Sequence, residues 1–366
     1  MSLELHVDRA RWRAHLEHTM VACGGPTALI PVIKGNGYGL GLTTLAEAAA
    51  ELGVDVIAVG QPEELTDIVG FTASPSSGSA GRVVVLQPWR PDLGEPFHPL
   101  ACQRSPNGPA METVIRTVSD ISALRAAPAD SVILLELGSA MRRFGIDESE
   151  LAEVARLLAS SSGPRCVGLS IHLPLVADQA DLDTIIRAVG NLTASGARPA
   201  ALWVSHLTDD QARTVGGATG LAVRRRVGTR LWLGDPGALQ VRAQVLAVHP
   251  MARGERFGYR RRATRAAGHL LVVSGGTAHG IGLEAPPSAA TPRTRARVAT
   301  LGLLGAAGRT RSPFTVNGSR CDFAESPHMQ VSMLWLPTRV SPPPPGEYVS
   351  VQVRHTTTAF DTVVFT

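Results

Sequence analysis

The 366-residue chain is poor in aromatic residues, in cysteine and in long apolar runs. Aromatic side chains make up 4% of it and charged side chains 18%, against 44% hydrophobic residues. This composition is typical of a folded enzyme and excludes a disordered or fibrous chain. The cysteines are too widely spaced for a CxxC metal site or a disulfide framework, so we expect reduced thiols and no bound metal. They are Cys23, Cys102, Cys166 and Cys321.

Membrane and nucleic-acid partners are not predicted either. No stretch of 18 apolar residues is present, and the N-terminal segment MSLELHVDRARW has no apolar core of the signal-peptide type. We therefore expect a cytoplasmic protein. The net charge of +4 is carried partly by two arginine runs, 224–226 and 260–262. These runs lack the aromatic interleaving and the zinc or basic-helix patterns of nucleic-acid-binding proteins.

Apolar, β-branched segments recur eight times in the first 235 residues, and amphipathic stretches that close on Gly or Ser separate several of them. Strands that alternate with helices in this way pair in parallel through right-handed crossovers, and eight such units close into a barrel. The fold class predicted for residues 1–236 is therefore α/β, a (β/α)8 TIM barrel. Its strands are expected at 28–34, 54–60, 82–87, 112–118, 131–137, 166–172, 200–206 and 221–227.

The pattern changes after this barrel. Helical periodicity disappears, and short strand-like segments such as HLLVVSG, SPFTVNG and YVSVQVRH follow one another. We expect residues 237–366 to form a C-terminal β domain. Residues 71–81 (FTASPSSGSAG) and 341–346 (SPPPPG) are predicted to be an exposed loop and a stiff polyproline stretch.

Three residues with useful chemistry, Lys34, His172 and His206, lie at the carboxyl ends of predicted strands, where barrels carry their active sites. A lysine at a barrel mouth is partly desolvated, which lowers its pKa and makes its amine a competent nucleophile for a Schiff base. From position alone, a surface lysine at a turn is the alternative.

The segment PVIKGNGYGLG around Lys34 resembles VxKANAYGHG, the lysine motif of alanine racemase and related fold-type III enzymes, which use pyridoxal 5'-phosphate (PLP). The resemblance implies that Lys34 forms an aldimine with PLP and that Tyr38 contacts the phosphate. LLELGSAMRRFGID is similar to KxDTGMxRxG of the same family, which makes Arg143 the residue expected to bind the substrate carboxylate. Glu136 replaces a lysine that some members carbamylate, and its carboxylate is expected to orient Arg143.

Further cofactor contacts are implied at the sixth and seventh strands. GLSIHLPL resembles GxxTHF of the family, so His172 is expected to pack against the pyridine ring. In SHLTDDQAR, the spacing of Thr208 and Gln211 predicts a capping box that opens a helix. Either Ser205 or Thr208 is expected to contact the phosphate.

The eighth unit, RRRVGTRLWLGD, is similar to RxGxxxYG. The match implies that Arg226 faces the pyridine nitrogen and that Gly228 and Thr229 cradle the phosphate with backbone amides. A guanidinium with a pKa above about 12 does not protonate the ring nitrogen, which weakens the cofactor as an electron sink. Racemases of the family share this arginine, whereas decarboxylases of the same fold type use a carboxylate, so Arg226 argues against decarboxylation.

The second catalytic base is where the resemblance fails. In alanine racemases, a tyrosine in a GYADG motif of the partner subunit acts on the opposite face of the substrate. The corresponding segment here, GTAHG, has Thr277 at the tyrosine position and His279 two residues later. An aliphatic hydroxyl is no useful base, whereas a histidine with a pKa near about 6.5 is suited to proton transfer. His279 is the candidate, with an exposed loop histidine as the alternative. RCDFAESPHMQVSML resembles GRVxMD and places Met329 at the substrate.

The leading hypothesis is a PLP-dependent amino-acid racemase or epimerase that acts on a small amino acid through the Lys34 aldimine. The resemblance also implies a homodimer, because the family's second catalytic residue comes from the partner. One alternative is a PLP-binding homologue without racemase activity, serving as a carrier, a regulator or a one-base relic. A PLP lyase or decarboxylase is less favoured.

Overall fold

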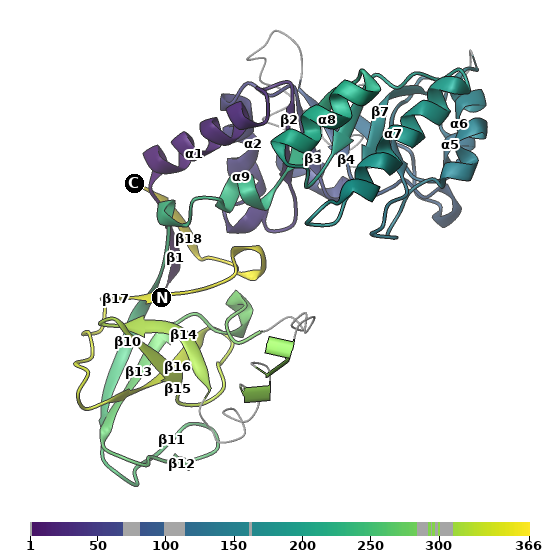
Figure 1. Cartoon of the computed structure of the whole chain (residues 1–366). Helices are drawn as coiled ribbons and strands as arrows, with labels where there is room; N and C mark the ends of the chain where they lie inside the picture. The colour runs from purple at the N-terminus through teal and green to yellow at the C-terminus, as the bar shows by residue number, and fades with distance from the viewer. Residues whose placement is uncertain are drawn as a thin grey trace. The chain divides into compact units, whose positions relative to one another are not determined.

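The computed structural model describes residues 2–68, 81–98, 114–160, 163–283 and 310–366, and three short pieces, 292–293, 295–296 and 299–300. It divides into two compact units (Figure 1). One contains Arg13–Gly234, and the other combines Met1–Trp12 with Asp235–Thr366. The predicted domain 1–236 included the N-terminal strand, which the structure assigns to the β unit instead because it pairs there on both sides.

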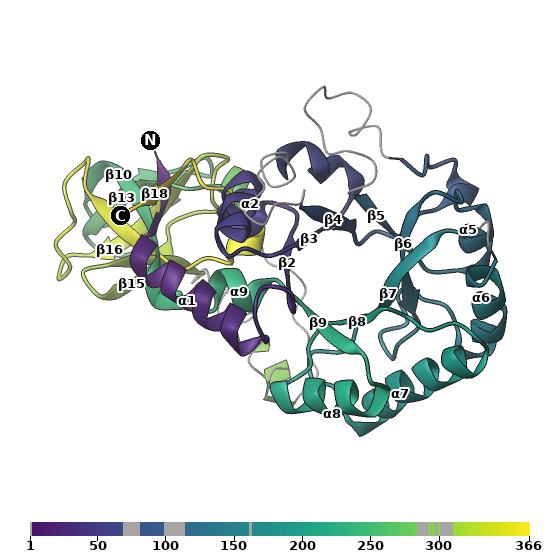
Figure 2. The same ribbon diagram turned by 90° about the horizontal axis from the view of Figure 1, so that it is seen from above.

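The first unit is a closed barrel of eight parallel strands, as the sequence predicts (Figure 2). The last strand pairs with the first, which closes the ring. All eight expected strands are present, with ends that differ from the predicted ones by a few residues. They are β2 (Leu29–Ile33), β3 (Val56–Val59), β4 (Arg82–Val85), β5 (Val114–Val118), β6 (Val132–Leu137), β7 (Arg165–Ile171), β8 (Ala201–Val204) and β9 (Ala222–Val227).

Helices cover the outside of the ring (Figure 2). They are amphipathic: α7 buries residues spaced three and four apart, such as Leu182, Ile185 and Val189, against the strands. Thr208 caps α8 in the predicted capping box with Gln211. The helices are α1 (Arg9–Ala22), α2 (Leu42–Glu51), α5 (Ile121–Ala126), α6 (Leu151–Leu158), α7 (Gln179–Ala194), α8 (Asp209–Thr219) and α9 (Thr229–Leu233), with 3-10 turns η1 (Gly37–Gly39), η2 (Pro62–Ile68), η3 (Pro91–Leu93) and η5 (Glu148–Glu150).

Side chains alternate along the strands between two apolar layers. Inside the ring, residues such as Ile30, Leu134 and Trp203 pack together. A second, larger layer between strands and helices contains Leu135 and Ile185 among others. Because both faces of each strand are covered, the strands read as continuous apolar runs, which is typical of parallel sheets.

The second unit contains the predicted β domain. Its strands pair antiparallel, apart from the parallel pairing of β1 with β18. Its eight-stranded sheet has the order β13-β16-β15-β14-β17-β10-β1-β18, with β13 also paired to β10. The strands are β1 (Leu3–Val7), β10 (Leu239–Met251), β13 (Gly268–Ser274), β14 (Arg311–Val316), β15 (Ser319–Phe323), β16 (Val331–Pro337), β17 (Tyr348–Val351) and β18 (Thr362–Phe365). A separate ribbon pairs β11 (Arg256–Phe257) with β12 (Arg262–Ala263), and 3-10 turns lie at η6 (Pro236–Ala238), η7 (Thr277–His279) and η8 (His355–Thr357).

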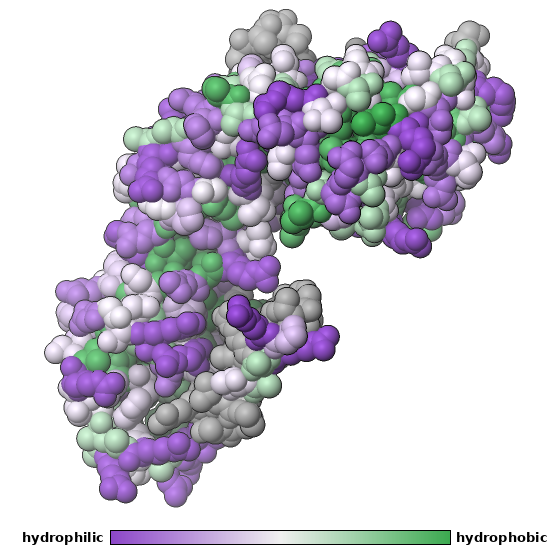
Figure 3. Space-filling model, viewed as in Figure 1, coloured by the Kyte–Doolittle hydropathy of each residue, from purple (hydrophilic) through white to green (hydrophobic). Residues whose placement is uncertain are grey.

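Several of the remaining predictions concern segments that lie only partly within the described residues. The predicted loop 71–81 and Cys102 lie outside them, except for Gly81. The polyproline stretch 341–346 joins β16 to β17 without helix or strand. The three described cysteines are free, and the described part of the chain holds neither a metal-binding cluster nor a helix that could cross a membrane. Hydrophilic residues cover most of the face of each unit that Figure 3 shows.

The barrel interior supplies a direct test of the fold. Leu134 is fully buried inside the ring, so Leu134→Ala should lower the free energy of unfolding by about 2–5 kcal/mol, through lost burial and the cavity left behind. Urea denaturation followed by circular dichroism measures the change. Leu93→Ala is the control, because Leu93 is 74% exposed and its truncation should change stability by less than about 0.5 kcal/mol. Equal effects of the two substitutions would contradict the interior position of Leu134.

Candidate active site

The barrel gathers most of the predicted site residues at the carboxyl ends of its strands. Lys34 follows β2 directly and His172 follows β7, while Arg226 is the penultimate residue of β9. Glu136 is the penultimate residue of β6, and Arg143 lies in the loop after that strand. The charge of Arg143 acts on Lys34, His172 and Glu136. The structure therefore brings these five residues together at one mouth of the barrel.

A buried carboxylate that the sequence motifs do not reveal fixes the backbone beside Lys34. Glu64, in η2, accepts hydrogen bonds from the backbone amides of Gly35 (2.7 Å) and Gly60 (2.6 Å). It is only 7% exposed. One side chain thus ties the end of β2 to the end of β3. The only signal for it in the sequence is a glutamate shortly after the second strand, in QPEEL.

The environment of Lys34 lowers the pKa of its amine. The main cause is desolvation by the surrounding protein, although the residue as a whole remains exposed. The positive charges of Arg143 and Arg226 lower the pKa further, and the Glu64 carboxylate opposes them. The neutral, nucleophilic amine is therefore more populated than in a free lysine. The sequence contains 35 lysine and arginine residues, and Lys34 is the only lysine among them.

Tyr38 and Gly228 fit closely against each other. Tyr38 lies in η1 in the left-handed region, with φ 56°, and is 5% exposed. A Cβ atom at position 228 would collide with its hydroxyl. Helix α9 begins at the next residue, and Trp232 within it donates a 2.8 Å hydrogen bond to the carbonyl of Val32. This bond anchors the helix to β2, and the Tyr38 hydroxyl lies beside Gly228, at the start of the helix.

The protonation state of Tyr38 suits a hydrogen-bond donor. Desolvation, assisted by the negative charge of Glu64, raises its pKa to about 12. The phenol therefore keeps its proton at neutral pH and can donate it to an anion.

Arg226 holds a buried donor atom without a partner. Its Nη2 donates to the carbonyl of Ile171 at 3.0 Å, whereas its Nε has no hydrogen-bond acceptor among the described residues. Burial lowers its pKa, and the carboxylate of Glu136 opposes that effect. Burial in turn raises the pKa of Glu136, and the positive charges of Arg226 and, to a smaller extent, Arg143 oppose that rise. A buried polar atom without a partner is rare in a folded protein and commonly marks a functional role.

His172 is held in place by its neighbours. Its Nδ1 lies 2.9 Å from the hydroxyl of Ser205, which also accepts a 3.2 Å hydrogen bond from the amide of Leu173. The ring of His206 packs edge-on against it, with centroids 5.4 Å apart. Thr208, the other predicted phosphate contact, accepts from the amide of Gln211 as the cap of α8. Both hydroxyls therefore have protein partners in this structure.

The side chain of His279, in the β unit, is largely shielded from solvent. Its side chain is 12% exposed, and its Nε2 lies 3.2 Å from Asp361. Its Nδ1 accepts a 3.2 Å hydrogen bond from the amide of Gly276, so both ring nitrogens are engaged. Backbone bonds from Thr277 and Ala278 attach the same turn to the segment that carries Met329, whose side chain is 74% exposed.

Comparison with known proteins shows the family. The profile of the alanine racemase N-terminal domain matches residues 7–206, more than half of the chain, and the protein therefore belongs to the alanine racemase family. Alanine racemase of Campylobacter jejuni (strain 81-176) is 28% identical over 161 residues. That match covers 44% of this chain and 42% of the relative, so it spans less than half the length of either protein.

Solved structures of alanine racemases share the fold over nearly the whole chain. The Streptomyces lavendulae protein has a TM-score of 0.69 at 19% identity and covers 100% of this chain and 97% of its own. The Bartonella henselae protein, solved with covalently bound pyridoxal phosphate, has a TM-score of 0.66 at 17% identity and covers 97% and 91%. At these identities, the likeness establishes the architecture alone.

The environment of His172 predicts a specific acid sensitivity. Desolvation and the charges of Arg226 and Arg143 lower its pKa to about 4, against about 6.5 in an unfolded chain. Protonation therefore favours unfolding, and the stability contributed by the neutral ring is lost as the pH falls from 6.5 toward 4. Urea denaturation at pH 7 and at pH 4.5 should show a smaller loss for His172→Gln than for the parent. The same loss in both proteins would contradict the lowered pKa.

Proposed function

We propose that this protein is a PLP-dependent racemase or epimerase of a small amino acid, with Lys34 as the residue that attaches to the cofactor. The position of Lys34 carries the proposal: the chain's only lysine lies at the active end of a barrel, and its amine has a lowered pKa. Membership of the alanine racemase family supports the same conclusion.

Three features fit PLP. The Tyr38 hydroxyl and the backbone at Gly228 and Thr229 form a cradle that a Cβ would fill, and there they would hold the phosphate. The unpartnered Nε of Arg226 would face the pyridine nitrogen. His172 would pack on the ring. We propose that Ser205 acts by orienting His172. Thr208 acts as the cap of α8, because its hydroxyl is already engaged by the amide of Gln211.

The chain's own residues supply binding and proton transfer. PLP contributes an aldehyde that attaches to amines and a ring that stabilises negative charge at the substrate Cα. Arg143 binds the substrate carboxylate, and Glu136 balances the charge of both arginines. The neutral amine of Lys34 removes or returns a proton at Cα, as a general base with a lowered pKa does. Arg226 leaves the ring a weak electron sink, which favours racemisation over decarboxylation.

Proton transfer on the opposite face is proposed for His279 of the partner subunit in a homodimer, with Met329 lining the substrate. The imidazole would receive the proton at Nδ1, which requires release of the Gly276 amide. That engagement of both ring nitrogens also favours the second candidate function, a PLP protein that exchanges protons on one face only and does not racemise.

Cofactor attachment is tested on Lys34 itself. Purified protein supplied with PLP should develop a visible absorbance band, and borohydride reduction should fix PLP on Lys34, as peptide mass spectrometry detects. Lys34→Ala leaves no lysine in the chain, so band and adduct should both disappear. Arg198→Ala, at an exposed surface arginine, is the control and should keep both. A parent protein that takes up no PLP overturns both candidate functions.

Racemisation is tested in deuterated water with PLP-loaded protein and single enantiomers of alanine. Deuterium should enter Cα with inversion, and His279→Gln should slow inversion by roughly 100-fold, the typical contribution of a general acid or base. Exchange with retention should persist through Lys34. His249→Gln, at an exposed histidine of the same unit, is the control. Exchange with retention alone in the parent supports the second candidate, and an unchanged inversion rate in His279→Gln removes His279 from the mechanism.

A further inference from the structure

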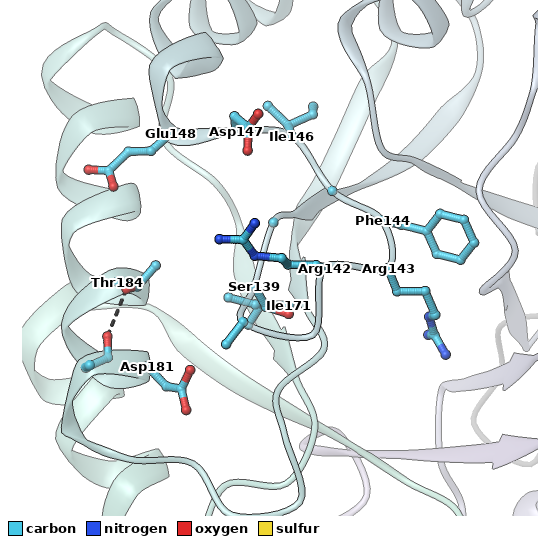
Figure 4. Close-up of a pocket in the computed structure, with 14 residues that line it drawn as sticks. Ser139, Arg142, Arg143, Phe144, Ile146, Asp147, Glu148, Ile171, Asp181 and Thr184 are labelled. Atoms are coloured by element: carbon cyan, nitrogen blue, oxygen red, sulfur yellow. Dashed lines mark hydrogen bonds between the residues drawn. The ribbon is translucent and has the colours of Figure 1, made fainter.

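A cavity of about 650 Å3 lies on the outer side of the loop that carries Arg143. The loop residues 138–148 form one wall, and the first turns of α7 form the other (Figure 4). Arg142 points toward α7 (Figure 4). Arg143 also lines the cavity, but its side chain points in another direction and its guanidinium group lies over the ring of Phe144 (Figure 4). Asp181 and Thr184 face the cavity from α7. The guanidinium groups of these two consecutive arginines therefore point in different directions.

Groups of opposite charge line the cavity without being paired to one another. Glu148 is neutralised by Arg187 at 2.8 Å and accepts from Asn191 at 2.9 Å. Arg142, Asp147 and Asp181 form no ion pair within 4.0 Å among the described residues. One oxygen of Asp181 accepts from the amide of Asp178, at 3.1 Å, which leaves its other oxygen available. Arg143, which also lines the cavity, forms no such ion pair either. The cavity therefore presents two guanidinium groups and two carboxylates that lack a partner of opposite charge among the described residues, and of the two guanidinium groups that of Arg142 points toward α7.

This charge pattern selects a class of ligand. A simple anion attracted by Arg142 meets two carboxylates, and a simple cation attracted by the carboxylates meets the guanidinium. A molecule that carries both charges satisfies all three groups, and guanidinium–carboxylate pairing adds directional hydrogen bonds. Ile171 and Ala180 line the same cavity and offer apolar contact to a short aliphatic side chain.

We propose that this cavity binds a second zwitterionic α-amino acid, outside the cofactor site, with its carboxylate on Arg142 and its ammonium group on Asp147 and Asp181. The occupant is a free amino acid and not a macromolecule, because the charged groups line one cavity of about 650 Å3.

The loop provides a physical link to the mouth of the barrel. The amide of Gly138 donates to the carbonyl of Ile146 and the amide of Ile146 donates to the carbonyl of Glu136, both at 2.9 Å. The loop is thus closed at its base, with Arg142 in the left-handed region at φ 48°. An amino acid held on Arg142 constrains the adjacent Arg143. Because Arg143 is the proposed contact of the substrate carboxylate, an occupied cavity would change substrate binding. That effect rests on the proposed function, whereas binding of the amino acid in the cavity does not.

The test uses Lys34→Ala without PLP, so that no covalent attachment to the cofactor contributes. L-alanine is titrated and followed by saturation-transfer NMR. We expect saturable binding that Arg142→Gln and Asp181→Asn each weaken by about tenfold or more, through loss of a charge-assisted contact. Arg142→Lys, which keeps the charge, should stay within about threefold. Acetate and methylamine, each carrying one of the two charges, should bind at least about tenfold more weakly than L-alanine.

Two control variants locate the ligand. Arg143→Ala removes the predicted carboxylate contact of the cofactor site together with a guanidinium group that lines the cavity but does not point toward α7, so it should weaken L-alanine binding less than Arg142→Gln does. Arg198→Ala removes an exposed arginine elsewhere and should keep the binding. Loss of binding in Arg143→Ala but not in Arg142→Gln would place the ligand in the cofactor site and overturn this proposal, as would the absence of any binding. A protein that takes up no PLP but binds L-alanine through Arg142 keeps this site and overturns only the proposed function.

Discussion

The pairing of β9 with β2 is the constraint on which the candidate site depends. It sets Ile30 opposite Arg226 and Pro31 opposite Val227, so two segments almost 200 residues apart in sequence meet at one edge of the barrel. The bond from Trp232 to Val32 then fastens α9 onto the same strand. Without this closure, the turn that follows Lys34 and the start of α9 would have no fixed position relative to each other. Neither segment alone forms a site.

Electrostatic balance is the second constraint at that mouth. Arg143 and Arg226 carry positive charge, as does Lys34 when it is protonated, and Glu64 and Glu136 are the buried carboxylates that oppose them. Bringing like charges together costs free energy unless anions offset it, and the phosphate of the proposed cofactor would add to that balance. Desolvation lowers the pKa of Lys34 and of His172, and the positive charges of Arg143 and Arg226 lower both further. Positive charge in the barrel therefore attracts anions and also favours the neutral forms of these two bases.

The sequence alone was sufficient to predict the barrel. Parallel strands that are covered on both faces are continuous apolar runs, and these runs show in the sequence where the strands lie. The sequence also predicted that Lys34 and His172 lie at the carboxyl ends of strands, where the structure has them. It missed Glu64, whose partners Gly35 and Gly60 are set by the fold and not by spacing. It also left Ser205 and Thr208 as alternatives, because a hydroxyl's partner depends on geometry. In the β domain, the strands bury only one face and are separated by irregular turns, so the sequence does not specify which residues of neighbouring strands pair. The contact of His279 with Asp361 was therefore not predictable.

The fit between Tyr38 and Gly228 has a consequence for how this family member can change. Any side chain at position 228 would displace the tyrosine hydroxyl, and a smaller residue at position 38 would open a space beside the start of α9. The two positions are therefore expected to vary as a unit among relatives. Redesign of the proposed anion cradle for a differently shaped cofactor would have to replace both residues in a single step, since a change at one position alone leaves a collision or a void.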